Sequence, residues 1–146
     1  MKTQEEKDLR QAREEFLLES LDFYCKDPVN LIATEVGTGC TYTPNSKPGN
    51  KGCMIGRHLS AEQQKIADED STNGDTSWCE VVNILEDIPE KLIYLETGFL
   101  FQCQNLHDGE LHWTSAGLTY EGKQKVSNII ENFKLRKSKF PKKYKA

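Results

Sequence analysis

Hydrophobic residues recur at helical spacing in three parts of the chain. Each part carries apolar positions three or four residues apart, so that they fall on one face of a helix. The pattern predicts helices over residues 4–25, 99–108 and 120–136. The apolar faces consist of Leu9, Ala12, Phe16, Leu17, Leu21 and Tyr24 in the first helix, Phe99, Cys103 and Leu106 in the second, and Val126, Ile129, Ile130 and Phe133 in the third.

Polar residues at the expected helix starts support this reading and add shorter helices. Capping boxes, in which two side chains satisfy each other's backbone N–H groups, pair Thr3 with Glu6, Ser60 with Gln63 and Ser77 with Glu80. The second and third predict helices over residues 61–68 and 78–87. Asp87, Pro89 and Glu90 predict a further short helix, which Gly98 ends.

The middle of the chain has the alternation of β-structure. Residues 40–43 (CTYT) and 53–59 (CMIGRHL) predict two antiparallel strands joined by the nine-residue loop PNSKPGNKG. Residues 110–115 predict a short strand, and residues 31–36 fit a strand or a helical turn. We therefore expect a mostly helical α+β domain with a small β ribbon near residues 38–58. Residues 1–136 form the compact domain and residues 137–146 a flexible basic tail.

Charge is distributed unevenly along the chain. The formal net charge is −4 at pH 7, but residues 134–145 hold six lysines and Arg136 without an acid, so residues 1–133 carry −11. An acidic body disfavours nucleic acid and anionic membranes and favours a protein partner with a basic surface. Nucleic acid can be attracted only by the tail. We expect any homo-oligomer to form through the N-terminal helix.

The sequence has no apolar run of the roughly 20 residues that span a bilayer, and its N-terminus is charged rather than apolar. Five cysteines occur without a CxxC pair, which is typical of reduced thiols in a hydrophobic core. We therefore expect a cytoplasmic protein that needs no cofactor.

Two groups of residues are candidates for a site. Lys47, Lys51, Arg57 and His58 lie near the glycines of the central loop, where they can contact a small anionic ligand or a nucleotide. The loop has neither of the glycine-rich spacings typical of phosphate binding, GxxxxGK(S/T) and GxGxxG. An ordinary solvent-exposed loop therefore explains the same residues. His107, Asp108 and His112 are types that bind zinc, but their spacing matches no established zinc motif.

A pattern of short motifs resembles small uncharacterised proteins of bacteriophages and prophages. It consists of Cys40-x-Tyr42, then Gly52-Cys53-Met54-Ile55-Gly56, then Leu106-His107-Asp108. The resemblance implies a host-cell cytoplasm and supplies no catalytic residues. We expect a small phage-type accessory protein that binds a host or defence protein, or a small anionic ligand. The alternative is a metal-dependent hydrolase or nuclease using His107, Asp108 and His112.

Overall fold

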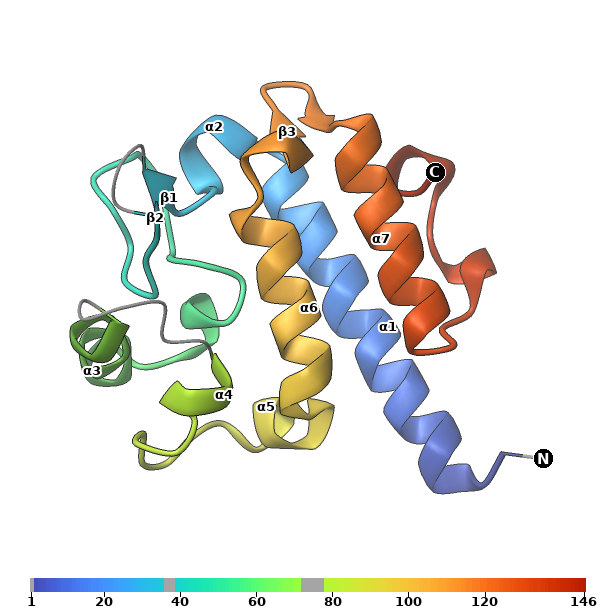
Figure 1. The fold of residues 1–146 in the computed structure, drawn as a ribbon, viewed down its shortest axis with the longest axis horizontal. Helices are drawn as coiled ribbons and strands as arrows, with labels where there is room; N and C mark the ends of the chain where they lie inside the picture. Colours follow the sequence, from blue (N-terminus) through green and yellow to red (C-terminus); the bar gives the residue numbers. More distant parts are fainter. Residues whose placement is uncertain (1, 36–38, 72–77) are drawn as a thin grey trace. The chain divides into compact units, whose positions relative to one another are not determined.

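A computed structural model describes residues 2–35, 39–71 and 78–146, with the backbone alone at residues 34–35, 39–40, 70–71 and 79–80. The fold is mostly helical α+β with small antiparallel sheets, as the hydrophobic pattern predicted (Figure 1). Backbone contacts divide it into two compact units. Unit 1 comprises residues 1–29 and 109–146, and unit 2 comprises residues 30–108.

Unit 1 is built on two long helices, α1 (Gln4–Cys25) and α7 (Tyr120–Asn132). Thr3 and Thr119 cap them as expected, each accepting a hydrogen bond from a backbone N–H of the first turn at 3.1 Å. A hairpin of β3 (Trp113–Thr114) and β4 (Gly117–Leu118) lies between them in sequence. The short helices η2 (Glu110–His112), η3 (Lys137–Lys139) and η4 (Lys142–Tyr144) complete the unit.

Helix α7 ends four residues earlier than its hydrophobic pattern predicted. Lys134 has a left-handed backbone (φ 53°), and the N–H of Leu135 donates to the carbonyl of Ile130 at 2.8 Å. The N–H of Lys134 donates to Glu131 at 3.2 Å, which completes a Schellman motif. The usual signal for this ending is glycine, and lysine stands in its place, so the sequence concealed the stop.

Unit 2 consists of shorter elements around a core that includes Met54, Ile55, Phe99 and Leu100, all fully buried. Its longest helices are α3 (Ala61–Ser71) and α6 (Thr97–Asp108), and the Ser60–Gln63 capping box forms as predicted. The predicted helix over residues 78–87 is wrong in length, because α4 covers only Trp78–Val81. Its predicted cap, Ser77, lies outside the described residues. Helix α5 (Glu90–Leu95) precedes α6, and α2 (Pro28–Leu31) bridges the two units in sequence.

The β ribbon exists, but its predicted pairing is wrong. Strand β2 (Gly39–Cys40) pairs with β1 (Thr34–Glu35), so the strand within residues 31–36 is the partner. Residues 53–59 form turns and the helix η1 (Gly56–His58) instead. The reason is close packing: a Cβ atom at Gly52 or Gly56 would overlap the carbonyl oxygen of Tyr42. The two glycines let the backbone of residues 52–56 approach the backbone of Tyr42 so closely that a regular strand with side chains on both faces would not fit there.

Residues 137–146 pack against the helices of unit 1, whereas we expected them to form a flexible tail. Phe140 is 2% exposed and Tyr144 is 4% exposed. The hydroxyl of Tyr144 donates to Asp22 of α1 at 2.6 Å, and the N–H of Ala146 donates to Ser127 of α7 at 3.0 Å. The tail therefore contributes two buried aromatic rings to the core of unit 1.

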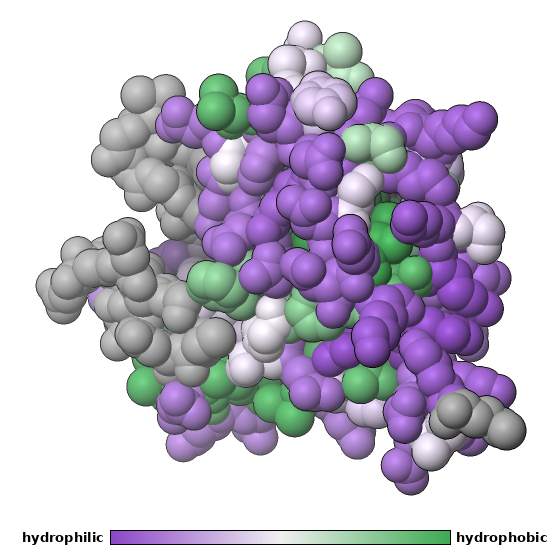
Figure 2. Space-filling view, turned by 45° about the vertical axis from the view of Figure 1, so that its right-hand side comes forward, coloured by the Kyte–Doolittle hydropathy of each residue, from purple (hydrophilic) through white to green (hydrophobic). Residues whose placement is uncertain are grey.

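The two units differ in charge. Unit 1 has 14 lysines and arginines against 11 acids, a net of +3, whereas unit 2 has 5 against 12, a net of −7. Figure 2 shows that hydrophilic residues dominate the face it draws, with hydrophobic residues in small separate groups. None of the helices in the described part of the chain is long and apolar enough to cross a membrane. Of the −11 that residues 1–133 carry, −7 therefore falls in unit 2.

Candidate ligand-binding pocket

Two of the four residues that the sequence offered as a candidate anion site, at the central loop, are engaged by hydrogen bonds to other parts of unit 2. The ammonium group of Lys47 donates to the carbonyl of Ile32 at 2.9 Å. That of Lys91 donates to Nδ1 of His58 at 2.9 Å. Lys51 is exposed, and Arg57 lies half-buried in η1. None of these four predicted residues lines either of the pockets described below.

Asn50 organises this loop, and the sequence analysis missed it. Its amide nitrogen donates to the carbonyls of Asn30, Leu31 and Ile32 at 2.8–3.3 Å. Its amide oxygen accepts from the N–H groups of Asn45 and Gly52 at 3.1 and 3.0 Å. One buried side chain thus contacts five backbone groups, with its two amide hydrogens shared among three carbonyls, which is a structural role. A polar residue between two glycines in a long loop was the available signal.

His107 and Asp108, from the predicted metal alternative, also form a structural network in unit 2. His107 is fully buried. Its Nε2 accepts from the N–H of Ala33 at 3.1 Å, so the ring proton lies on Nδ1, which donates to Asp108 at 2.8 Å. Gln104 donates to the same carboxylate oxygen at 2.9 Å. Both ring nitrogens are therefore already engaged.

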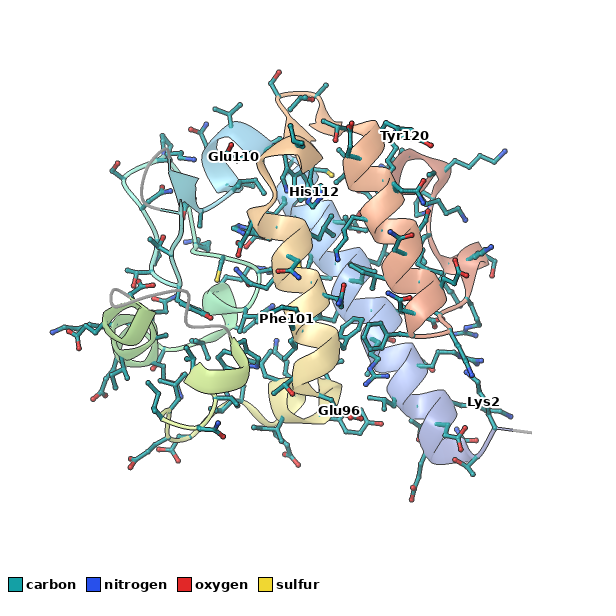
Figure 3. All side chains as sticks on the ribbon, in the orientation of Figure 1. Lys2, Glu96, Phe101, Glu110, His112 and Tyr120 are labelled. Atoms are coloured by element: carbon teal, nitrogen blue, oxygen red, sulfur yellow. The ribbon has the colours of Figure 1, made fainter. Side chains whose placement is uncertain are left out.

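The third predicted ligand, His112, belongs to unit 1, on η2 (Figure 3). Its imidazole lies against Gly109, where a Cβ atom would overlap it. Within the described residues, no three histidine, cysteine, aspartate or glutamate side chains gather in a way that would hold a metal ion. Because both ring nitrogens of His107 are engaged, neither is open to coordinate the metal ion that the proposed hydrolase would need.

The largest pocket described lies in unit 1 and has a volume of about 450 Å³. Three regions that are distant in sequence form it: the end of α1, the β3–β4 hairpin with the adjoining first turn of α7, and the helix η4. Its walls are Asp22, Cys25, Lys26, Ala116, Gly117, Leu118, Lys123, Lys143 and Tyr144. Three lysines against one aspartate give the lining a formal charge of +2. The size falls within the range of small-molecule sites.

The carboxylate of the pocket, Asp22, is already engaged by Tyr144. The phenolic O–H donates to Oδ1 of Asp22 at 2.6 Å, a short charge-assisted hydrogen bond. Burial raises the pKa of Tyr144, and the bond to Asp22 and its charge raise it further, so the phenol keeps its proton. Asp22 is thereby partly withheld from the three lysines, which remain the dominant charge of the cavity.

Cys25 places a thiol in the same wall. Burial raises its pKa, although a hydrogen bond from the backbone of Leu118 and the charge of Lys143 act in the opposite direction. The thiol is therefore protonated and a weak nucleophile at neutral pH. Gly117, beside it, has a φ of 118°, and a Cβ atom there would come within 4.0 Å of the sulfur. That is an ordinary van der Waals distance, so the positive φ, and not a lack of space, favours glycine at this position.

The thiols of Cys53 and Cys103 are buried in unit 2, which agrees with their interpretation as core residues. The side chains of Cys40 and Cys79 lie outside the described part of the structure. Sequence reasoning passed over the pocket lysines because Lys26, Lys123 and Lys143 come from three segments that are distant in sequence. The one signal available was the group of lysines at residues 142–145 next to an aromatic residue.

A second, smaller pocket in unit 1 has a volume of about 190 Å³ and adjoins the ion pair between Glu14 and Arg136. Its walls mix acids and bases, with Glu14 and Glu15 opposite Arg136 and Lys139. It therefore has no excess of one charge.

The chain as a whole matches no model of a known protein family, no curated protein and no solved structure in the three comparisons made.

Proposed function

We propose that this protein acts by binding, and that it holds a small anionic ligand in the pocket between α1, the β3–β4 hairpin, α7 and η4. The observation that carries the proposal is the gathering of Lys26, Lys123 and Lys143 around one cavity whose single carboxylate is held by Tyr144. This keeps the anionic ligand expected from the sequence and moves its site from the central loop to unit 1.

The pocket suits an anion for two physical reasons. Positive charges gathered around a concave site attract an anion more strongly than the same charges spread over a flat surface. The lysine side chains come from three separate segments, so a bound anion would add a connection to those that the Tyr144–Asp22 and Ala146–Ser127 hydrogen bonds already make. Binding to the folded state must then raise its stability.

Thermal unfolding in the presence of small anions tests this proposal. Phosphate and organic phosphates at millimolar concentration are expected to raise the melting temperature. Lys143→Ala is expected to remove most of that rise. Its matched control is Lys142→Ala, which changes the adjacent exposed lysine that does not line the pocket. An equal response of the two variants would show that general charge, and not the pocket, is responsible.

A protein partner with a basic surface is a second candidate function, favoured by the net charge of −7 on unit 2. Ile84, Ile93 and Tyr94 are 45–54% exposed in a segment that also exposes Glu86, Asp87, Glu90 and Glu96. Apolar anchors surrounded by acids suit a basic partner, because charge speeds encounter and apolar burial slows dissociation.

The proposed phage-type accessory role, directed at a host or defence protein, belongs with this second candidate. Affinity capture from bacterial cells tests it, with Ile93→Asp/Tyr94→Asp as the control bait. A protein that is retained by the unaltered chain and lost from the variant supports the role. Capture that is equal with both baits contradicts this surface.

A further inference from the structure

The charge balance of the pocket in unit 1 points to a particular class of ligand. Its three lysines and Asp22 leave a formal charge of +2, which a dianion would neutralise. A phosphomonoester is such a dianion near neutral pH, since its second pKa is about 6. An inorganic anion would leave the apolar part of the wall, formed by Ala116 and Leu118, without a partner.

The Asp22–Tyr144 hydrogen bond determines whether that charge is available. The net charge of +2 is the same with or without this bond, but a carboxylate released inside the pocket would pair with one lysine and occupy its ammonium group. The hydroxyl of Tyr144 prevents this by holding Oδ1 of Asp22 at 2.6 Å. Since Tyr144 is 4% exposed and lies in η4, the position of the C-terminal segment sets how many of the three ammonium groups are open to a ligand.

We propose that the pocket selects a dianionic organic ligand of the phosphomonoester class, and that Tyr144 sets this preference by holding Asp22. The inference rests on the proposed function, because it names the ligand of the same site. Asp22 and Tyr144 are positioning and selecting residues here. The lysines bind the phosphate, and the apolar wall contacts the organic group.

Calorimetric titration with phenyl phosphate and phenyl sulfate tests the charge preference. The two probes have nearly the same shape, but one is a dianion and the other a monoanion. Phenyl phosphate is expected to bind at least about tenfold more tightly, and more tightly than inorganic phosphate. Equal affinities for the two phenyl esters would overturn the inference while leaving anion binding intact. Binding of none of the three probes would overturn the proposed function, and this inference with it.

The role of Tyr144 is tested by a two-residue cycle. Tyr144→Phe keeps the buried ring and removes the hydroxyl, and we expect it to weaken phenyl phosphate binding roughly fivefold. Asp22→Asn alone raises the formal charge of the lining to +3, so it is the reference for the double variant. In that background Tyr144→Phe should cost little affinity, because no carboxylate is left to compete. A segment that had merely come loose would lower the affinity in both backgrounds. Unchanged affinity in Tyr144→Phe, or an equal loss in the two backgrounds, would overturn the assignment.

Tyr120→Phe is the matched control for the loss of a phenol. Tyr120 is 72% exposed, begins α7 in the same unit and does not line the pocket (Figure 3). Its affinity for phenyl phosphate should equal that of the unaltered protein. A fivefold loss in this variant as well would contradict a specific role for Tyr144.

Discussion

Arg136 holds the carboxylate of Glu14 with both its backbone and its side chain. Its N–H donates to Oε2 at 2.6 Å, and its guanidinium donates to Oε1 and Oε2 at 2.6–3.1 Å. Glu14 is 3% exposed, in the middle of α1. The chain beyond α7 is therefore fixed to α1 just before the segment that supplies Lys143 and Tyr144 to the pocket.

Replacing Glu14 tests this attachment. Glu14→Gln keeps the shape and removes the charge, and should lower the free energy of unfolding by about 1–3 kcal/mol in urea titration. Glu15→Gln, at the exposed neighbouring position, is the control and should change stability little. A loss in the control as large as that in Glu14→Gln would contradict a specific role for the ion pair.

The same pair predicts a dependence of stability on pH. Burial acts to raise the pKa of Glu14, but hydrogen bonds from Arg136 and the charges of Arg136 and Arg10 outweigh it and leave the pKa below its ordinary value. The contribution is then complete above the unfolded-state pKa of about 4.5 and is lost as pH falls through the lower folded-state value. Acid unfolding should be steeper in the unaltered protein than in Glu14→Gln; parallel curves would contradict this.

His107 is expected to matter for stability and not for metal binding. His107→Ala leaves the N–H of Ala33 and the carboxylate of Asp108 without this partner, and should cost about 2–5 kcal/mol in urea unfolding. His107→Gln retains an acceptor for Ala33 and should lose less. EDTA should leave the melting temperature unchanged. A fall on chelation, restored by zinc, would instead favour the hydrolase alternative.

Two glycines of unit 2 form a matched pair for substitution. Gly56→Ala should destabilise by about 1–3 kcal/mol, because the added Cβ would overlap the backbone of Tyr42. Gly98→Ala, in the first turn of α6, has open space within 4 Å and should stabilise by up to about 1 kcal/mol. Thermal unfolding of both variants is the measurement. Stabilisation by Gly56→Ala would contradict the close contact with Tyr42.

The alkylation rate of the Cys25 thiol is a probe of the pocket, because this side chain lines its wall. Because its pKa is raised by burial, alkylation by iodoacetamide at pH 8 should be slower than that of a free thiol and should accelerate at higher pH. Phenyl phosphate should slow it further by occupying the pocket. Peptide mapping by mass spectrometry assigns the label. Labelling of Cys25 that is fast and insensitive to the ligand would place the thiol outside the binding site.

The helices were predictable from the sequence, because their boundaries depend on local signals. Thr3, Ser60 and Thr119 cap as expected, and most of the predicted apolar positions are buried, with Leu9, Ala12 and Phe133 half-buried. The failures arise where a backbone conformation has no local signal. Lys134 ends α7 in a position that favours glycine, and Gly56 allows a contact with Tyr42 that replaces the expected strand.

The candidate site could not be predicted in the same way. Clustering of cations along the sequence drew attention to Lys47, Lys51, Arg57 and His58, yet Lys47 and His58 are engaged in hydrogen bonds within unit 2. The pocket lysines are brought together only by tertiary packing of α1, α7 and η4. The relationship to small proteins of phages and prophages, which the short motifs suggested, stays a prediction.

Amide chemical shifts during titration with phenyl phosphate test the central claim most directly, because they locate the bound anion residue by residue. The account predicts saturable shifts at Cys25, Lys26, Leu118, Lys123, Lys143 and Tyr144, which line the pocket of unit 1. Shifts confined to residues 44–58 would return the site to the central loop and contradict the account.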